Sequence, residues 1–417
     1  MELRASVEAL WRIEAPQLIA TLARRIGNLD LAEDLAAEAF VAALEQWPVE
    51  GVPPRPGAWL MTTAWHKAID RARREETARR KAPLLVAGPG DDASAEALDP
   101  IPDDLLTMLF TTCHPLLSPE SRVALTLRLF GGLTTDEIAR AFLAPSATIG
   151  QRISRAKRTL AEARVPIEAP SAADLPERLL VVLDVLYLIF NEGYSASSGE
   201  QVVRADLAVE AMRMGRVLAG LVPTEPEVFG LVALMELQTS RFRTRVDDHG
   251  IPVRLEDQDR RRWDRTLINH GLGMLDRAFA LARPLGPYAL QAAISACHAR
   301  AITFADTDWS AILALYDALG QVTASPVVQL NRAVAVLHID GPEAALAATA
   351  PLLEDRRLTG YHLLGAVRGD LLGRLGRHTE AAEELERAAG LAPTRQERQL
   401  LLSRMTDALA AAAKGPA

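Results

Sequence analysis

The sequence predicts an all-α protein, and three observations support this fold class. Ala, Leu, Arg and Glu, which favour helices, dominate the composition, while aromatic residues make up 5% of the chain. Runs of Val, Ile, Thr and Tyr at alternating spacing, which are typical of strands, are scarce. Apolar residues instead recur at i, i+3 and i+4 along much of the sequence. With 417 residues, the chain is expected to form more than one domain, because a domain usually holds about 100–200 residues.

The composition also excludes several classes of protein. Hydrophobic residues at 49% and charged residues at 24% exclude a wholly disordered or collagen-like chain. Two cysteines, Cys113 and Cys297, exclude a disulfide framework and a four-thiolate zinc site, and they suit a reducing cytosol. The longest apolar run, Leu179–Phe190, is too short to cross a membrane and contains Asp184. With no signal peptide in the sequence, we expect a cytoplasmic protein that does not contact the membrane.

Charge and proline content divide the chain into four segments. A basic cluster closes a first module, and an acidic stretch rich in Pro and Gly has the composition of a flexible linker. A second module ends in another basic cluster, and several prolines separate it from a long helical extension. The predicted segments are 1–81, 82–100, 101–165 and 175–417.

Apolar periodicity predicts three helices in the first module and four in the second. A three-helix bundle followed by a four-helix module is therefore expected before the extension. The predicted helices are Pro16–Gly27, Leu29–Trp47 and Gly57–Arg80, then Asp104–His114, Pro119–Phe130, Thr134–Phe142 and Ser146–Ala163.

The last two helices of the second module have the pattern of a helix-turn-helix. Thr134 is predicted to cap the first helix, with Glu137 three residues later completing a capping box. The segment Leu143-Ala144-Pro145 ends that helix, and Ser146 starts the next one. Polar and basic side chains of the second helix share one side, which suits a DNA major groove. A solvated basic helix in an ordinary bundle is the alternative.

A second candidate contact with DNA lies on the third helix of the first module. Trp59 and Trp65 stand beside the basic residues of segment 67–74. Aromatic rings next to positive charge can hold single-stranded DNA, because bases stack on the rings while cations follow the phosphates. Core packing of both tryptophans beside a solvated basic face is an equal alternative.

Taken together, these motifs resemble those of bacterial RNA polymerase sigma factors of the extracytoplasmic-function type. The resemblance covers about residues 8–163, and the order and spacing of its motifs are specific. It is carried by Ala32-Glu33-Asp34-Leu35-Ala36-Ala37-Glu38-Ala39-Phe40 with Trp47, by Pro56-Gly57-Ala58-Trp59-Leu60 running into Ala68-Ile69-Asp70-Arg71-Ala72-Arg73-Arg74, and by the helix-turn-helix.

The resemblance implies a sigma-2-like domain at 1–81, a sigma-4-like domain at 101–165, and two partners, core RNA polymerase and promoter DNA. It implies contacts to the β′ clamp helices and the β flap of the polymerase, melting and reading of the −10 element, and reading of the −35 element. The implied polymerase-binding residues are Glu33, Asp34, Leu35, Glu38, Phe40 and Trp47, where acids and aromatic rings suit a basic partner helix. The implied −10 residues are Trp59, Lys67, Asp70, Arg71, Arg73 and Arg74. The implied −35 residues are Thr134, Thr135, Ser146, Thr148, Gln151, Arg152, Ser154, Arg155, Lys157 and Arg158.

The extension resembles that of a group of these sigma factors with a long C-terminal helical region. Two stretches carry this resemblance, Leu186–Ser195 on the one hand and Leu255–Arg260 with Trp263-Asp264 on the other. Near the C-terminus, small, large and proline positions match a tetratricopeptide hairpin, and an earlier copy around 333–348 is weaker. Such repeats usually form a groove for a partner, so we expect the extension to regulate sigma activity in cis, with a regulatory protein or a ligand bound to it. The matching hairpin positions are Gly369, Ala381, Leu385, Ala388 and Pro393.

The sequence gives little support for catalysis or for a cofactor. It contains no nucleophile elbow, zincin motif or P-loop. The adjacent pairs Cys113-His114 and Cys297-His298 have a poor metal-binding spacing and are expected to pack in cores. A mixed cluster of acids and arginines within 241–262 is expected to be a salt-bridged loop, with a ligand pocket as the alternative.

Three hypotheses therefore remain from the sequence. The first is an alternative sigma factor with a built-in regulatory extension. The second is a helix-turn-helix transcriptional regulator with a ligand- or protein-sensing repeat domain, which leaves residues 30–74 without a role. The third is an enzyme or scaffold in the extension beside a vestigial DNA-binding module.

Overall fold

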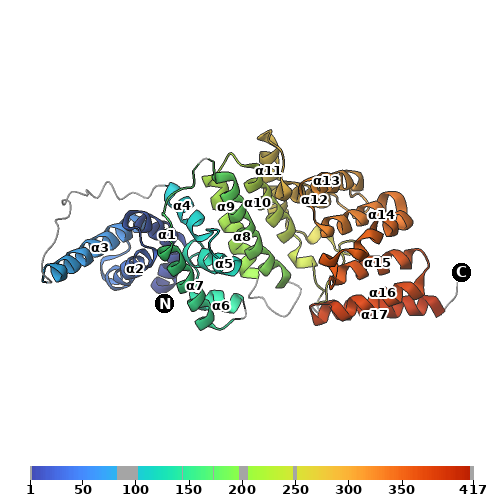
Figure 1. Cartoon of the computed structure of the whole chain (residues 1–417), viewed down its shortest axis with the longest axis horizontal. Helices are drawn as coiled ribbons and strands as arrows, with labels where there is room; N and C mark the ends of the chain where they lie inside the picture. The colour runs from blue at the N-terminus through green and yellow to red at the C-terminus, as the bar shows by residue number, and fades with distance from the viewer. Residues whose placement is uncertain are drawn as a thin grey trace. The chain divides into compact units, whose positions relative to one another are not determined.

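The computed structural model describes residues 2–81, 102–142, 144–171, 173–196, 205–247 and 251–413. Regular structure in these ranges is helical, apart from an isolated β-bridge between Val246 and Pro252, so the all-α prediction is confirmed (Figure 1). The chain divides into two compact units, which we call unit 1 (Met1–Ile189) and unit 2 (Phe190–Ala417). The predicted linker at 82–100 lies outside the described residues.

The boundary between the units lies inside one helix, α8 (Leu175–Ala196), and not at the prolines that precede it. The first turns of α8 belong to unit 1, where Arg178 donates a hydrogen bond to the backbone carbonyl of Phe110 at 2.7 Å. The last turns belong to unit 2, where the ring of Tyr194 packs against those of Phe190 and Phe242. Prolines mark where a helix begins, but side-chain contacts decide to which core each part of it belongs.

Unit 1 begins with the predicted three-helix module, α1 (Glu2–Ile26), α2 (Leu29–Glu50) and α3 (Pro56–Lys81). The helix α1 begins well before the predicted start, because Pro16 lies inside it instead of at its first turn. The side chain of Asn28 caps α2 by accepting a hydrogen bond from the backbone N–H of Leu31 at 3.0 Å. Contacts join all three helices around a core that includes Leu22, Leu35 and Leu60.

The second module also has the predicted helices, α4 (Pro102–Thr112), α5 (Pro119–Leu129), α6 (Thr135–Ala141) and α7 (Ser146–Glu162). The capping box forms as expected. The backbone N–H of Thr134 donates to the Glu137 carboxylate at 2.8 Å, and the backbone N–H of Glu137 donates to the Thr134 hydroxyl at 3.2 Å. The helix-turn-helix prediction for α6 and α7 is thereby confirmed.

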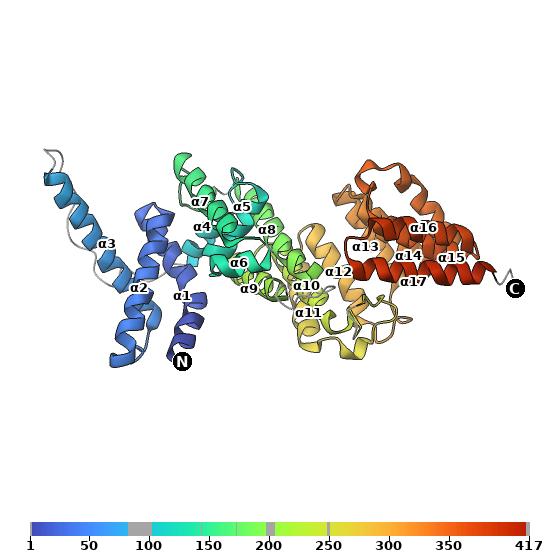
Figure 2. The same ribbon diagram turned by 90° about the horizontal axis from the view of Figure 1, so that it is seen from below.

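Unit 2 is built from helices that pack mostly on their neighbours in sequence, which is typical of a helical array (Figure 2). Four 3₁₀ helices, numbered η3 to η6, lie between α-helices among its described residues. Beyond the end of α8, its elements are α9 (Ala205–Leu221), α10 (Pro226–Thr239), η3 (Phe242–Thr244), η4 (Arg260–Arg262), α11 (Arg265–Ala280), α12 (Pro287–Arg300), α13 (Trp309–Val322), α14 (Pro326–Thr349), η5 (Ala350–Glu354), η6 (Arg356–Leu358), α15 (His362–Arg374), α16 (His378–Leu391) and α17 (Arg395–Ala413).

The helices α15 and α16 form the expected repeat-like hairpin, and α17 packs beside them (Figures 1 and 2). A Cβ atom on Gly369 would lie 2.7 Å from the Cγ atom of Leu385, so the two helices approach too closely for a larger residue there. Ala381, Leu385 and Ala388 are buried. In the weaker copy, Gly341 has a φ of 87° and interrupts α14, so the segment forms two shorter helices.

Candidate nucleic-acid interface

The second helix of the helix-turn-helix, α7, has one buried face and one exposed polar face. Ile149, Ile153, Ala156 and Leu160 are buried against the module. Among the predicted −35 residues, Thr134, Ser146, Thr148, Gln151, Ser154, Arg155 and Arg158 are exposed, and Thr135 and Arg152 are half-buried. These side chains leave a basic and amide-bearing face on α7, as the sequence predicts.

Lys157 is the exception, because its side chain is 9% exposed and does not join that face. Its ammonium group donates hydrogen bonds to Asp30 at 2.8 Å and to Glu33 at 2.5 Å, both on α2. Burial disfavours its charge, but the two carboxylates more than offset this effect and raise the pKa of Lys157. The expectation that Lys157 belongs to the DNA-reading face is therefore wrong for this structure.

Glu33 joins the two modules through a buried group of charges. Its carboxylate accepts hydrogen bonds from the ammonium group of Lys157 on α7 and from the guanidinium of Arg128 on α5, each at 2.5 Å. The Glu33 side chain is 12% exposed. The indole N–H of Trp11 also crosses between the modules and donates to the backbone carbonyl of Gly132 at 3.1 Å. One carboxylate therefore faces two cations in this structure and does not lie on the surface predicted to bind polymerase.

The rest of the predicted polymerase-binding set divides between core and surface. Leu35, Phe40 and Trp47 are buried, with Phe40 in edge contact with Trp11 and Trp47 in edge contact with Trp59. The structure therefore does not support the aromatic anchor expected from Phe40 and Trp47. Asp34 and Glu38 are exposed on the opposite side of α2.

Two apolar side chains outside the predicted polymerase-binding set continue the exposed face of α2. Val41 is 54% exposed and Leu44 is 41% exposed, at three and six residues beyond Glu38. Together with Asp34 and Glu38 they form what we call the α2 stripe. A stripe of carboxylates and aliphatic side chains is suited to a basic, partly apolar partner helix.

The predicted −10 residues lie along α3, and most of them are exposed. Asp70, Arg71, Arg73 and Arg74 are exposed, while Lys67 is half-buried and lies 3.5 Å from the Glu38 carboxylate. Trp59 is half-buried against Trp47 in the module. Trp65 is half-buried as well, and the Arg25 guanidinium lies 5.6 Å from its ring centroid. Both tryptophans thus contribute to packing and retain exposed area beside a basic helix.

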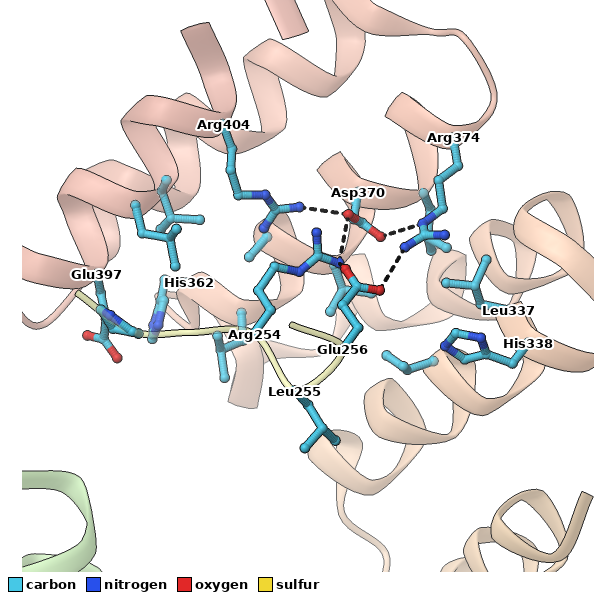
Figure 3. A pocket seen from close by; sticks show the side chains of 18 of the residues that line it. Arg254, Leu255, Glu256, Leu337, His338, His362, Asp370, Arg374, Glu397 and Arg404 are labelled. Carbon is cyan, nitrogen blue, oxygen red and sulfur yellow. Dashed lines mark hydrogen bonds and ion pairs between the residues drawn. The ribbon is translucent and has the colours of Figure 1, made fainter. Parts of the chain in front are cut away.

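In unit 2, the mixed cluster at 241–262 contains salt bridges, as expected, and its residues Arg254, Leu255 and Glu256 also line a cavity (Figure 3). The Asp370 carboxylate is the centre of the network and holds Arg374 at 2.8 Å, Arg404 at 2.9 Å and Arg254 at 3.2 Å. Arg254 also pairs with Glu256. Burial opposes ionisation of Asp370, but the three arginines lower its pKa below the usual value.

The cysteines of the two cysteine–histidine pairs pack in cores, as expected. Cys113 is buried, lies 3.4 Å from the Thr126 hydroxyl, and has its pKa raised to about 11 by burial. Cys297 is half-buried and packs against the core of α12 and α13. Within the described residues, no group of three or more His, Cys, Asp or Glu side chains has an arrangement that could hold a metal ion. In the same residues, no helix is both long and apolar enough to span a bilayer.

A periodic signal in the sequence was available for the buried charges. Lys157 is four residues after Ile153 and three before Leu160, which are both buried. Glu33 is likewise four residues after Leu29 and three before Ala36, on the buried side of α2. Charged residues in register with an apolar face are candidates for a buried ion pair. Arg128, the other cationic partner of Glu33, lies 95 residues from it, and no local pattern connects the two.

Comparison with known families identifies both modules. Residues 10–78 match the model for sigma-70 region 2, and residues 107–160 match the model for sigma-70 region 4. Residues 178–279 match a family of unknown function, DUF6596.

Relatives cover the chain to different extents. An uncharacterized protein of Rhizobium meliloti is 46% identical over 387 residues, which are 92% of this chain and 91% of that protein. The probable ECF RNA polymerase sigma factor SigI of Mycobacterium tuberculosis is 29% identical over 197 residues, 43% of this chain and 67% of the relative. The ECF RNA polymerase sigma factor SigK of Mycobacterium bovis is 32% identical over 103 residues, 25% of this chain and 55% of the relative. No solved structure matches the chain.

The sigma factor matches cover the two modules that hold the exposed face of α7 and the α2 stripe, and the match of unknown function begins in α8 and continues into unit 2. Sigma factors are initiation factors and not enzymes. The chain therefore belongs to the sigma factors of the extracytoplasmic-function type and carries a C-terminal helical extension.

Proposed function

We propose that this sigma factor binds core RNA polymerase through the α2 stripe, melts and reads the −10 element with α3, reads the −35 element with α7, and is regulated in cis by unit 2. The observation that carries the proposal is the confirmed helix-turn-helix, whose second helix has an exposed face of arginine, glutamine and hydroxyl side chains. These are the groups that read base edges and neutralise phosphates in a major groove. This role would place the chain in the cytoplasm, where the polymerase acts.

Polymerase binding is assigned to the exposed part of α2 and not to its aromatic residues. Asp34 and Glu38 supply negative charge, and Val41 and Leu44 supply apolar area that burial in an interface would stabilise. The β′ clamp helices are the partner that the family resemblance implies for this helix. Contact of the second module with the β flap completes the proposed polymerase interface.

Binding of the −10 element is assigned to α3. Arg71, Arg73 and Arg74 are exposed on three positions within one turn, and Trp59 and Trp65 keep partly exposed rings nearer the start of the helix. Cations that follow phosphates and rings that stack on bases are the two components of single-strand binding. A helix-turn-helix regulator that lacks sigma activity, which is the alternative, leaves this helix and the α2 stripe without a role.

The −35 assignment predicts a specific loss in Arg152→Ala and Arg155→Ala. A bidentate contact to a base contributes about 1–3 kcal/mol, and a phosphate contact mainly changes salt dependence. We therefore expect about 5- to 100-fold less run-off transcription from promoters that need the upstream element, because 1.4 kcal/mol corresponds to about tenfold. The measurement is run-off transcription with core polymerase on a promoter library, with salt varied in parallel.

The matched control for these two variants is Arg164→Ala, which removes an exposed arginine beyond the end of α7. Binding to core polymerase should be unchanged in all three variants. An equal loss in Arg164→Ala, or a loss of polymerase binding in Arg152→Ala and Arg155→Ala, would contradict the assignment.

Two features support regulation in cis: the covalent connection between the units through α8, and the acidic composition of the extension. Unit 2 follows unit 1 within a single helix, so its local concentration near α7 is on the order of millimolar, at which even weak contacts are occupied. The sequence after residue 165 is acidic, with 26 Lys and Arg against 32 Asp and Glu. An acidic extension is suited to contact the basic face of α7 or a basic surface of the polymerase.

Removing unit 2 by truncation after Ile189 is expected to change run-off transcription by at least about tenfold, since tethered contacts of about 1.4 kcal/mol or more are lost. This cut keeps Arg178 and its hydrogen bond to Phe110 in unit 1. A decrease would mean that unit 2 completes the active complex, and an increase would mean that it occludes DNA. If the truncated chain keeps the helix content expected for unit 1 and its transcription is unchanged, regulation in cis is ruled out.

A further inference from the structure

The two extension stretches singled out in the sequence meet at one place in unit 2, and initiation leaves them without a role. Tyr194 belongs to the first stretch, and its hydroxyl oxygen accepts a hydrogen bond from the Arg241 guanidinium at 3.1 Å. Arg241 also lies 5.9 Å from the ring centroid of Trp263, which belongs to the second stretch. Arg245 lies 3.7 Å from the ring centroid of Tyr194. Arginine and aromatic side chains far apart in the sequence thus form one cluster.

A cavity of about 290 Å³ lies at this cluster, and we call it the polar cavity. Arg241, Trp263 and His298 line it, together with neutral polar and apolar side chains and without any carboxylate. Trp263 is 3% exposed, yet its indole N–H has no hydrogen-bond partner, and neither has the Nδ1 atom of His298. A buried indole N–H can only donate, so it lacks an acceptor that a bound ligand would supply.

Positive charge dominates the surroundings of the polar cavity. Arg260 is 4% exposed beside it and donates to the backbone carbonyls of His298 at 2.9 Å and Ala301 at 3.2 Å. Burial first, then the nearby charges of Arg241, Arg260 and His338, lower the pKa of His298 to about 3. His298 is therefore neutral at pH 7, and the cavity has two nearby guanidinium groups with no acidic side chain among its lining residues. Such a site is suited to an anion.

A second cavity of about 360 Å³ adjoins the first, and we call it the apolar cavity. The two share Leu255, Trp309 and Val334 in their walls. Leucine, valine and aromatic side chains cover most of the apolar cavity, and the charges around Asp370 pair with one another at one side of it (Figure 3). Each volume is near or within the range of small-molecule sites, about 300–1,000 Å³.

We propose that unit 2 binds a small organic anion, whose carboxylate or phosphate head occupies the polar cavity at Arg241 and Trp263 and whose apolar body occupies the apolar cavity. The guanidinium of Arg241 neutralises the head, and the indole N–H of Trp263 donates to it. Leu255, Trp309 and Val334 lie where head and body meet. The proposal concerns binding alone and does not depend on the proposed role in initiation.

The test uses the full chain and four probes that share an eight-carbon body, measured by isothermal titration calorimetry. Nonanoate and octyl phosphate carry the proposed head, octanol has a neutral one and octyltrimethylammonium has a cationic one. We expect one of the two anions to bind at least about tenfold more tightly than octanol and octyltrimethylammonium, because hydrogen bonds to charged groups are among the strong ones. The anion that binds more tightly shows whether the natural head is a carboxylate or a phosphate. Equal binding of all four probes, or no binding by either anion, would overturn the proposal.

Variants locate the site. Arg241→Gln and Trp263→Phe should each weaken binding of the preferred anion about tenfold or more, because the first removes the positive charge beside the head and the second removes the indole N–H donor. Trp263→Phe keeps a buried ring, and circular dichroism on both variants reports whether unit 2 remains folded. Arg300→Gln is the matched control, since Arg300 is 55% exposed, lies on α12 and lines neither cavity. If the Arg241→Gln protein is folded and binds the anion as tightly as the Arg300→Gln protein does, the anion binds elsewhere and the assignment is overturned.

Discussion

Replacing Asp34 and Glu38 together with lysine is expected to lower the affinity for core RNA polymerase by about 100-fold or more. Both carboxylates are exposed on α2 and lie on the same face as Val41 and Leu44. Like charges brought together in an interface cost several kcal/mol, and every 1.4 kcal/mol corresponds to about tenfold in affinity. The measurement is the dissociation constant of the complex between the full chain and core polymerase, at two salt concentrations.

The matched control changes the net charge by the same amount elsewhere in unit 1. Glu120 and Glu168 are exposed and lie outside α2. The double variant Glu120→Lys with Glu168→Lys should therefore leave the affinity for core polymerase within about threefold of the wild type, because charges away from the contact act mainly through long-range attraction. A second double variant, Val41→Ser with Leu44→Ser, tests the apolar half of the α2 stripe and should also weaken binding. If the Asp34/Glu38 variant binds polymerase as tightly as the control, the α2 stripe is not the polymerase interface.

Removing the Glu33 carboxylate is expected to loosen the contact between the two modules of unit 1. In Glu33→Ala, Arg128 and Lys157 lose the carboxylate that they share, and Lys157 is 9% exposed. Breaking a buried ion pair by removing one partner costs about 3–5 kcal/mol. Amide hydrogen exchange in 29–50 and 146–162 should therefore accelerate by about 100-fold or more in the full chain, because exchange follows the free energy of local opening.

Two further variants separate the buried charge from a general loss of packing. Asp30 pairs with the same lysine but its side chain is 66% exposed, so Asp30→Ala should change local stability by less than about 1 kcal/mol. Replacing all three charges, in Glu33→Leu with Arg128→Met and Lys157→Met, removes the unpaired cations and should restore most of the protection. Exchange in Glu33→Ala as slow as in Asp30→Ala would mean that the carboxylate does not join the modules.

The helices and the helix-turn-helix could be predicted from the sequence because their causes are local. The capping box at Thr134 depends on a residue three positions away, and the apolar face of α7 follows from the spacing of Ile149, Ile153 and Leu160. The motifs that resemble sigma factors are likewise contiguous, and the matches to regions 2 and 4 bear them out. The start of α1 was placed too late because Pro16 was taken as its first turn, although the helix continues through it.

The side chains available to partners were harder to predict, because composition does not reveal which face of a helix is buried. Phe40 and Trp47 are rings suited to an interface, but they pack against Trp11 and Trp59 from neighbouring helices. The exposed Val41 passed unnoticed for the same reason. A helix has several apolar positions, and the tertiary contacts decide which of them are covered.

The sequence by itself therefore determined that the chain is all-α, where most of its helices lie, and that it carries the region 2 and region 4 modules of a sigma factor before a helical extension. Only the tertiary structure decided that Lys157 and Glu33, which lie 124 positions apart in the sequence, form an ion pair, and that Arg241, Trp263 and His298 line one cavity. Periodicity, capping and composition act within a few turns of a helix. Burial of a charge and the shape of a cavity depend on segments that only folding brings together.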